Sequence, residues 1–114
     1  MTDNNRTTGK PKSQFQRVAM FLDSQNVYLK PNQAELLLAF AKSKGRLEPP
    51  KSYYNSQKKN QLTHNIRLKK QGFKGVDVPD GKNSADKQLV FDCIKRVAMK
   101  PSLEIIILVL GDWD

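Results

Sequence analysis

The sequence has no apolar run approaching the roughly 18 residues that a membrane helix needs. Its first 17 residues are polar, so they also lack the apolar segment of a signal peptide. With 114 residues the chain is long enough for one domain with a single core, and too short for two. We therefore expect a soluble, cytoplasmic protein without a membrane partner.

Cysteine and histidine are equally scarce, with Cys93 and His64 the only examples. A single cysteine excludes an internal disulfide and a thiolate zinc cluster, so Cys93 is expected to pack. His64 lies in a basic helical segment, where packing or a surface position is favoured over general-base catalysis. Ser-His-Asp catalysis would have to use this histidine and is discounted. The glycine patterns of P-loop and dinucleotide-binding folds are absent from the sequence, which leaves those folds without support.

Acidic residues are few, and the basic residues are concentrated in one segment. Lys and Arg number 20 against 11 Asp and Glu, which gives a net charge of +9. Within residues 42–74 the only glutamate or aspartate is Glu48. A polyanion would be drawn to this segment, and nucleic acid is the natural polyanion of a cytoplasm. Lysine-rich solvated helices would carry the same charge, so both interpretations stay open. The basic residues that we expect to contact nucleic acid are Lys58, Lys59, Arg67, Lys69, Lys70 and Lys82.

Short apolar runs alternate with helical patterns along the chain. Residues 1–16 are polar and without apolar periodicity, and they predict a disordered basic arm ahead of one domain over residues 17–114. Strands are predicted at residues 18–22, 51–55, 73–78 and 103–110, and helices at residues 32–45, 56–71 and 84–100. This alternation predicts an α/β fold with a mostly parallel sheet flanked by helices on both faces.

The apolar spacing also assigns a buried face to each predicted helix. The side chains predicted to be buried are Leu36, Leu37, Phe40 and Ala41 in the first helix, Leu62 and Ile66 in the second, and Leu89, Val90, Cys93, Ile94 and Val97 in the third. Asn32 and Glu35 are expected to form a capping box where the first helix begins.

Aspartates follow two of the most apolar predicted strands. Asp23 comes directly after the first, and Asp112 and Asp114 follow the last. Ligands of open parallel sheets bind beyond the carboxyl ends of the strands, where neighbouring strands would crowd these carboxylates. Like charges at close range repel unless a cation lies between them, and oxygen ligands suit Mg²⁺ or Mn²⁺. An aspartate after a strand also serves in turns and caps, so this simpler interpretation stays open.

Two further acids lie in the third predicted helix. Asp86 is in its first turn, where a carboxylate favours the helix dipole in any case. Asp92 lies six residues on, about 120° round the helix, and is interpreted as structural. Lys82 could contact a phosphate or Asp86, or be an ordinary surface lysine, and Trp113 could stack on a base or pack.

Three motifs, in this order, resemble a known family. They are F-L-D-S-Q-N at residues 21–26, K-N-S-A-D-K-Q-L-V-F-D at residues 82–92 and G-D-W-D at residues 111–114. Together they resemble the NYN domain, and within it the bacterial LabA-like proteins of the PIN-like ribonuclease superfamily. The resemblance covers nearly all of the chain beyond the predicted arm.

The resemblance implies a metal-dependent ribonuclease that hydrolyses RNA phosphodiester bonds. In that family the acids hold one or two divalent cations that activate water. The resemblance assigns the binding of Mg²⁺ or Mn²⁺, and a part in catalysis, to the residues that match the family's acids: Asp23, Asp86, Asp112 and Asp114. It implies that Asn26 orients water or phosphate. Single-stranded RNA is the partner that this activity implies.

The sequence departs from the family pattern near its end. Leu110 stands where the family usually has a serine, Trp113 replaces a small residue, and the phenylalanine, strand and helix that normally follow are absent. We therefore expect a domain truncated at its C-terminus, with exposed apolar surface that favours association between copies, and activity as an endoribonuclease in the full-length form. The alternative is a catalytically inactive RNA-binding or regulatory module of the same fold. A phosphoacceptor receiver domain would use Asp23 differently and gives no role to D-W-D.

Overall fold

The computed structural model describes residues 16–81, 84–99 and 103–111. The strands are β2 (Arg17–Asp23), β3 (Arg46–Leu47), β4 (Lys51–Tyr54), β5 (Lys74–Asp77) and β6 (Leu103–Val109), and the helices are α1 (Pro31–Ser43), α2 (Lys59–Lys70) and α3 (Ser84–Met99). All described strand pairs are parallel. The predicted α/β class with a mostly parallel sheet is confirmed.

Strand β2 is the centre of the five-stranded sheet. On one side it pairs with β6, in a register that places Leu22 beside Val109. On the other side it pairs first with β3 and then with β4, and β5 lies beyond β4. Pro49 and Pro50 separate β3 from β4, and a proline cannot donate a ladder hydrogen bond. The short strand β3 was not predicted, and β3 and β4 act as one interrupted strand along β2.

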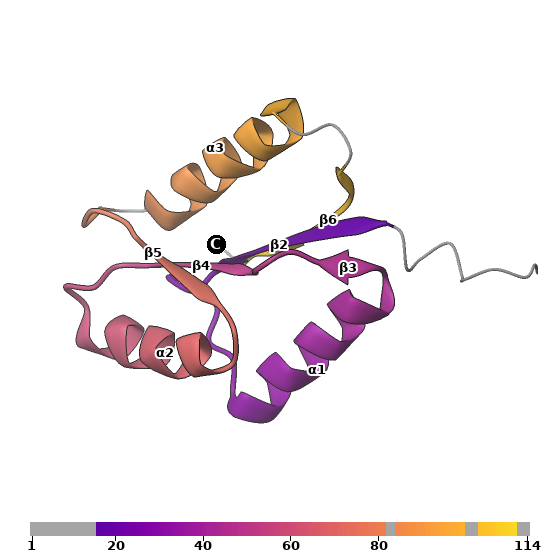
Figure 1. Ribbon diagram of the computed structural model, residues 1–114. Helices are drawn as coiled ribbons and strands as arrows, with labels where there is room; N and C mark the ends of the chain where they lie inside the picture. The colour runs from indigo at the N-terminus through magenta and orange to yellow at the C-terminus, as the bar shows by residue number, and fades with distance from the viewer. Residues whose placement is uncertain (1–15, 82–83, 100–102, 112–114) are drawn as a thin grey trace, which may run out of the picture.

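Helices cover both faces of the sheet, as predicted. Helices α1 and α2 lie on one face and α3 lies on the other (Figure 1). Met20 and Leu22 of β2 pack in the core on the α1 and α2 side, and Ala19 and Phe21 pack in the core on the α3 side. Burial on both faces explains why β2 is a continuous apolar run rather than an alternating one.

The predicted buried face of the first helix is wrong in part, although Ala41 is buried and Leu37 packs against the core, as predicted. Leu36 and Phe40 are 69% and 52% exposed, and the buried side chains are Ala34, Leu38 and Ala41. These three also recur at helical spacing, and the small alanines let the helix approach the sheet closely. The predicted capping box is wrong as well: α1 begins at Pro31, and the backbone N–H of Lys30 donates to Oε1 of Gln33 at 2.9 Å.

The predicted face of α2 is wrong, and the predicted face of α3 is wrong in part. In α2, Leu62 and Ile66 are exposed, and the buried residues are His64, Asn65 and Leu68. Two of these three residues are polar, and apolar spacing cannot identify buried polar positions.

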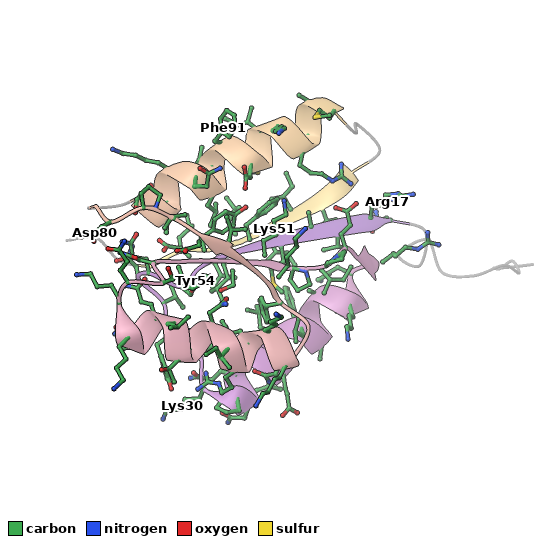
Figure 2. All side chains as sticks on the ribbon, turned by 60° about the vertical axis from the view of Figure 1, so that its left-hand side comes forward. Arg17, Lys30, Lys51, Tyr54, Asp80 and Phe91 are labelled. Atoms are coloured by element: carbon green, nitrogen blue, oxygen red, sulfur yellow. The ribbon has the colours of Figure 1, made fainter. Side chains whose placement is uncertain are left out.

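In α3, Leu89 is buried and Cys93 packs beside it, as expected. The remaining predicted core residues of α3 are exposed: Val90, Ile94 and Val97. Phe91 points away from the sheet (Figure 2). Half-exposed Ile106, Leu108 and Leu110 alternate along β6 with Ile107 and Val109, which contact the core under α1. Among the described residues, no helix has the length and apolar character that crossing a membrane requires.

Candidate functional site

The carboxyl ends of β2 and β6 lie side by side, which is the condition under which acids that follow the two strands would be brought close together. Leu22 pairs with Val109, so both chains leave the sheet at the same level. Just beyond β6, Gly111 lies so close to Asn26 that a Cβ on the glycine would be 2.5 Å from Cβ of Asn26. The segment after β6 therefore contacts the turn after β2. The next residue in the sequence, Asp112, and Asp114 lie outside the described residues.

Asp23 ends β2 and is fully buried. Its Oδ1 accepts a hydrogen bond from the backbone N–H of Gln25 at 3.2 Å, and its Oδ2 accepts one from Nδ2 of Asn26 at 3.0 Å. In the described part of the chain, no lysine, arginine or histidine forms an ion pair with this carboxylate. An ionised carboxylate that is buried without a cation is costly, so the position favours a bound cation.

Asn26 is held beside Asp23 by a tight turn. The backbone N–H groups of Asn26 and Val27 both donate to the carbonyl of Asp23, at 3.3 and 2.9 Å. The side chain of Asn26 is exposed, although its amide nitrogen is bonded to the buried carboxylate. This geometry allows Asn26 to contact a ligand that is bound at Asp23, as the role that the family resemblance implies for Asn26 requires.

Gln25 joins this turn to the start of α3. Its Oε1 accepts a hydrogen bond from the backbone N–H of Ala85 at 3.0 Å, and its Nε2 donates to the carbonyl of Gly81 at 3.2 Å. The first turn of α3, with half-buried Asp86, is thereby fixed to the turn that carries Asp23. Sequence reasoning did not identify Gln25, although its position between Asp23 and Asn26 in the first motif was a signal.

The four predicted metal-binding acids fall into two groups. Asp23 and Asp86 are described, whereas Asp112 and Asp114 are not, and neither is Lys82. Within residues 16–81, 84–99 and 103–111, no group of three or more His, Cys, Asp or Glu side chains is arranged to hold a metal ion. The complete four-acid set therefore stays a prediction.

Asp92 has a structural position, in agreement with its interpretation from the sequence. Its carboxylate accepts hydrogen bonds from the hydroxyl of Tyr53 at 2.7 Å and from Nε2 of Gln88 at 2.9 Å. Burial, and then the bond to Asp92, raise the pKa of the Tyr53 hydroxyl far above its ordinary value, so this group stays protonated. Asp92 thus anchors α3 to β4 through a neutral donor.

The predicted nucleic-acid contacts are divided between the two ends of α2. Lys58 and Lys59 are at its start, and exposed Lys69 and Lys70 are in its last turn, about 15 Å away along the helix axis. Because α2 follows β4, its start is near the carboxyl end of the sheet, where Asp80 also lies (Figure 2). Nζ of Lys58 is 4.0 Å from Oδ1 of Asp80. Lys58 and Lys59 are therefore the pair on the side of Asp23.

Arg67, the sixth predicted contact, belongs to an aromatic cluster. The rings of Tyr28 and His64 have centroids 4.5 Å apart, and Cζ of Arg67 lies 5.1 Å from the centroid of Tyr28. Nη1 of Arg67 donates to the hydroxyl of Tyr28 at 2.9 Å. His64 is buried, and its Nε2 accepts a hydrogen bond from the backbone N–H of Leu29 at 3.1 Å. Of the two positions expected for His64, packing and surface, the structure shows packing.

This environment predicts a pH dependence of stability. Burial, and then the charge of Arg67, lower the pKa of His64 in the folded protein below its ordinary value of about 6.5. As the pH falls below about 6.5, the unfolded chain binds a proton that the folded chain does not, so the free energy of unfolding decreases. Above that pH the contribution of His64 is fully present.

Urea denaturation between about pH 7.5 and pH 5.5 should show this decrease, and His64→Gln, which keeps an acceptor for Leu29, should reduce it. If the free energy of unfolding falls equally with pH in the wild type and in His64→Gln, the pH dependence does not come from His64.

Comparison with known proteins places the chain in a family. The sequence pattern of the family described as NYN domain matches residues 17–114. A solved structure of a protein of unknown function from Vibrio parahaemolyticus is similar with a TM-score of 0.67 at 21% identity, over 91% of this chain and 71% of that chain. At this identity the structural likeness supports the fold alone. No curated protein matches the chain. Because the family pattern extends over the whole described structure, the chain belongs to the NYN domain family of the PIN-like superfamily.

Proposed function

We propose that this NYN domain is a metal-dependent ribonuclease that hydrolyses phosphodiester bonds of RNA. The observation that carries the proposal is buried Asp23, which has no described cationic partner and lies where the segment after β6 contacts the turn after β2. A carboxylate in such a position is more stable with a cation beside it. The family match supplies the reaction class.

The described residues fit a hard divalent cation. Asp23 supplies buried carboxylate oxygens, and the turn of α3 fixed by Gln25 brings a second acid, Asp86, to the same end of the sheet. With Asp112 and Asp114, which follow Gly111 in the sequence, the proposed donors are all oxygen atoms, as Mg²⁺ and Mn²⁺ prefer. When bound, such a cation activates water and stabilises negative charge that develops on a phosphate.

Asn26 is proposed to orient the RNA phosphate or the attacking water, because its exposed amide is held against Asp23. Lys58 and Lys59 would attract the RNA backbone. A second candidate is an RNA-binding module without activity, which the basic start of α2 favours because it attracts phosphates whether or not the acids bind metal.

Incubation of the protein with labelled single-stranded RNA distinguishes these two functions. We expect cleavage products on a denaturing gel with Mn²⁺ or Mg²⁺ and none with EDTA, because the reaction needs the cation. A native gel in EDTA should still show the RNA shifted. RNA that is shifted but stays uncut with either metal would reject the nuclease and leave the binding module, and RNA that is neither shifted nor cut would reject both.

A further inference from the structure

Tyr28 is a large aromatic side chain that stays open to solvent near the acids. It lies five residues after Asp23 and is 64% exposed. Its ring is nevertheless fixed, because the hydroxyl accepts a hydrogen bond from Arg67 and the ring contacts that of His64. A side chain that is already ordered loses little conformational entropy when it binds a ligand.

Much of the Tyr28 side chain remains available to a ligand. His64 and Arg67 are three residues apart on α2, so the two contacts that hold the ring come from one surface of that helix. The ring still keeps the high exposure of 64%. An exposed aromatic ring that is held in place can stack on a planar ligand.

Two adjoining hollows connect Tyr28 with the site and with the lysines. The smaller, of about 130 Å³, is lined by residues that include Asn26, Tyr28 and Asn60. The larger, of about 680 Å³, is lined by residues that include Tyr28, Asn60, Lys58 and Lys59. Tyr28 and Asn60 line both hollows, so the two adjoin at these residues, with Asn26 on the smaller hollow and the two lysines on the larger. We refer to the two hollows together as the groove.

The chemistry of this groove suits a single-stranded nucleic acid. Lysines attract phosphates, and an exposed aromatic ring stacks on any base, because every base has a π face. A base in a duplex is already stacked on its neighbours and is not free to stack on Tyr28. The groove therefore favours a single strand over a duplex and makes no demand on sequence.

We propose that Tyr28 is a stacking platform that holds one base of single-stranded RNA beside the acids, with Lys58 and Lys59 binding the backbone that leads to it. This inference rests on the proposed function, since it names how the substrate of that site is held. Tyr28 acts as a positioning residue, which places a phosphate near Asp23.

The affinity for a fluorescein-labelled oligouridine of about ten nucleotides, measured by anisotropy in EDTA, tests the proposal without depending on cleavage. Tyr28→Ala should weaken binding about 5- to 150-fold, the range found when a stacking ring is removed. Tyr28→Phe keeps the ring and should bind nearly as the wild type. The matched control is Phe40→Ala, because Phe40 is also an exposed ring beside a cation, Lys44, but lies on α1. Its affinity should not change.

Two more arms keep the proposal falsifiable if Tyr28→Ala folds poorly. An oligomer of abasic sugars should bind the wild type more weakly than oligouridine, and duplex RNA should bind more weakly than either single strand of it. Lys59→Glu should weaken binding more than Lys70→Glu, a change of the same charge at the other end of α2.

Equal affinity of wild type and Tyr28→Ala, equal loss in Phe40→Ala, or equal binding of abasic and normal RNA would overturn the stacking role. Wild type that binds RNA through Tyr28 but never cuts it would reject the nuclease and leave the platform intact. Wild type that cuts RNA with no effect of Tyr28→Ala on affinity would do the reverse.

Discussion

Replacing Asp23 by asparagine is expected to reduce Mn²⁺-dependent RNA cleavage by orders of magnitude. The change keeps the shape of the side chain and removes the buried negative charge that we propose as a metal ligand. Cleavage is measured on labelled RNA at saturating Mn²⁺, with the wild type and the variant compared at equal protein concentration. Asp112→Asn should have the same effect, because both aspartates are proposed to share one cation.

The same substitution should leave the metal-free fold intact or slightly more stable. Asparagine can still accept the hydrogen bond from the backbone of Gln25, and a turned amide of Asn26 can restore the bond between the two side chains. The change also removes a buried charge without a described cation. In EDTA the melting temperature of Asp23→Asn should therefore equal or exceed that of the wild type.

Mn²⁺ should raise the melting temperature of the wild type more than that of Asp23→Asn. At a hundred times its dissociation constant, a cation that binds only the folded state adds about 2.7 kcal/mol, or about 10–20 °C in melting temperature for a domain of this size. Wild type should gain this and Asp23→Asn should gain less. Asp92→Asn is the control: it weakens the bond from Tyr53 and should lower stability, yet it should keep the full response to Mn²⁺. A wild-type melting temperature that Mn²⁺ leaves unmoved would reject the metal site.

The alternation of strands and helices along the chain was predictable, apart from the two-residue strand β3, because apolar runs and helical spacing are local signals. Val18 to Leu22 is apolar throughout, as expected of a strand that is buried on both faces of a parallel sheet. The helix faces were not predictable in the same way. In α1 the alanines Ala34 and Ala41 are buried while Leu36 and Phe40 are exposed. Which of these two apolar stripes is buried depends on how closely the helix approaches the sheet.

The site was predictable where it follows from strand ends and not where it depends on long-range contacts. The sequence marked Asp23 and the end of the last strand as the two places where acids follow apolar strands, and the pairing of β2 with β6 puts these ends side by side. Tyr28 contacts Arg67, which is 39 positions away in the sequence, and His64, which is 36 positions away. No local sequence pattern marks contacts over such separations. The helix predicted at residues 56–71 already put Lys59 and Lys70 at opposite ends, but the count of basic residues in 42–74 could not show that the end with Lys59 lies on the side of Asp23.

Replacing Gly111 by alanine is expected to disturb the site by crowding. The new Cβ would be 2.5 Å from Cβ of Asn26 and 2.9 Å from its carbonyl oxygen, so the turn after β2 or the end of β6 must move. Overpacking of this kind costs about 1–3 kcal/mol, which corresponds to about 5–20 °C in melting temperature. The movement should also separate Asp23 from the aspartates that follow Gly111, so the stabilisation by Mn²⁺ should decrease together with cleavage.

Leu110→Ala is the neighbouring control for Gly111→Ala. Leu110 is 40% exposed, so its truncation removes little buried apolar surface and places no atom against Asn26. We expect it to change the melting temperature far less and to keep the response to Mn²⁺. Gly111→Ala should therefore have a larger effect than Leu110→Ala, because only Gly111→Ala forces the end of β6 away from the turn after β2. If Gly111→Ala melts, binds Mn²⁺ and cuts RNA like the wild type, the approach of Gly111 to Asn26 does not hold the acids together, and the proposed site must be built without the segment after β6.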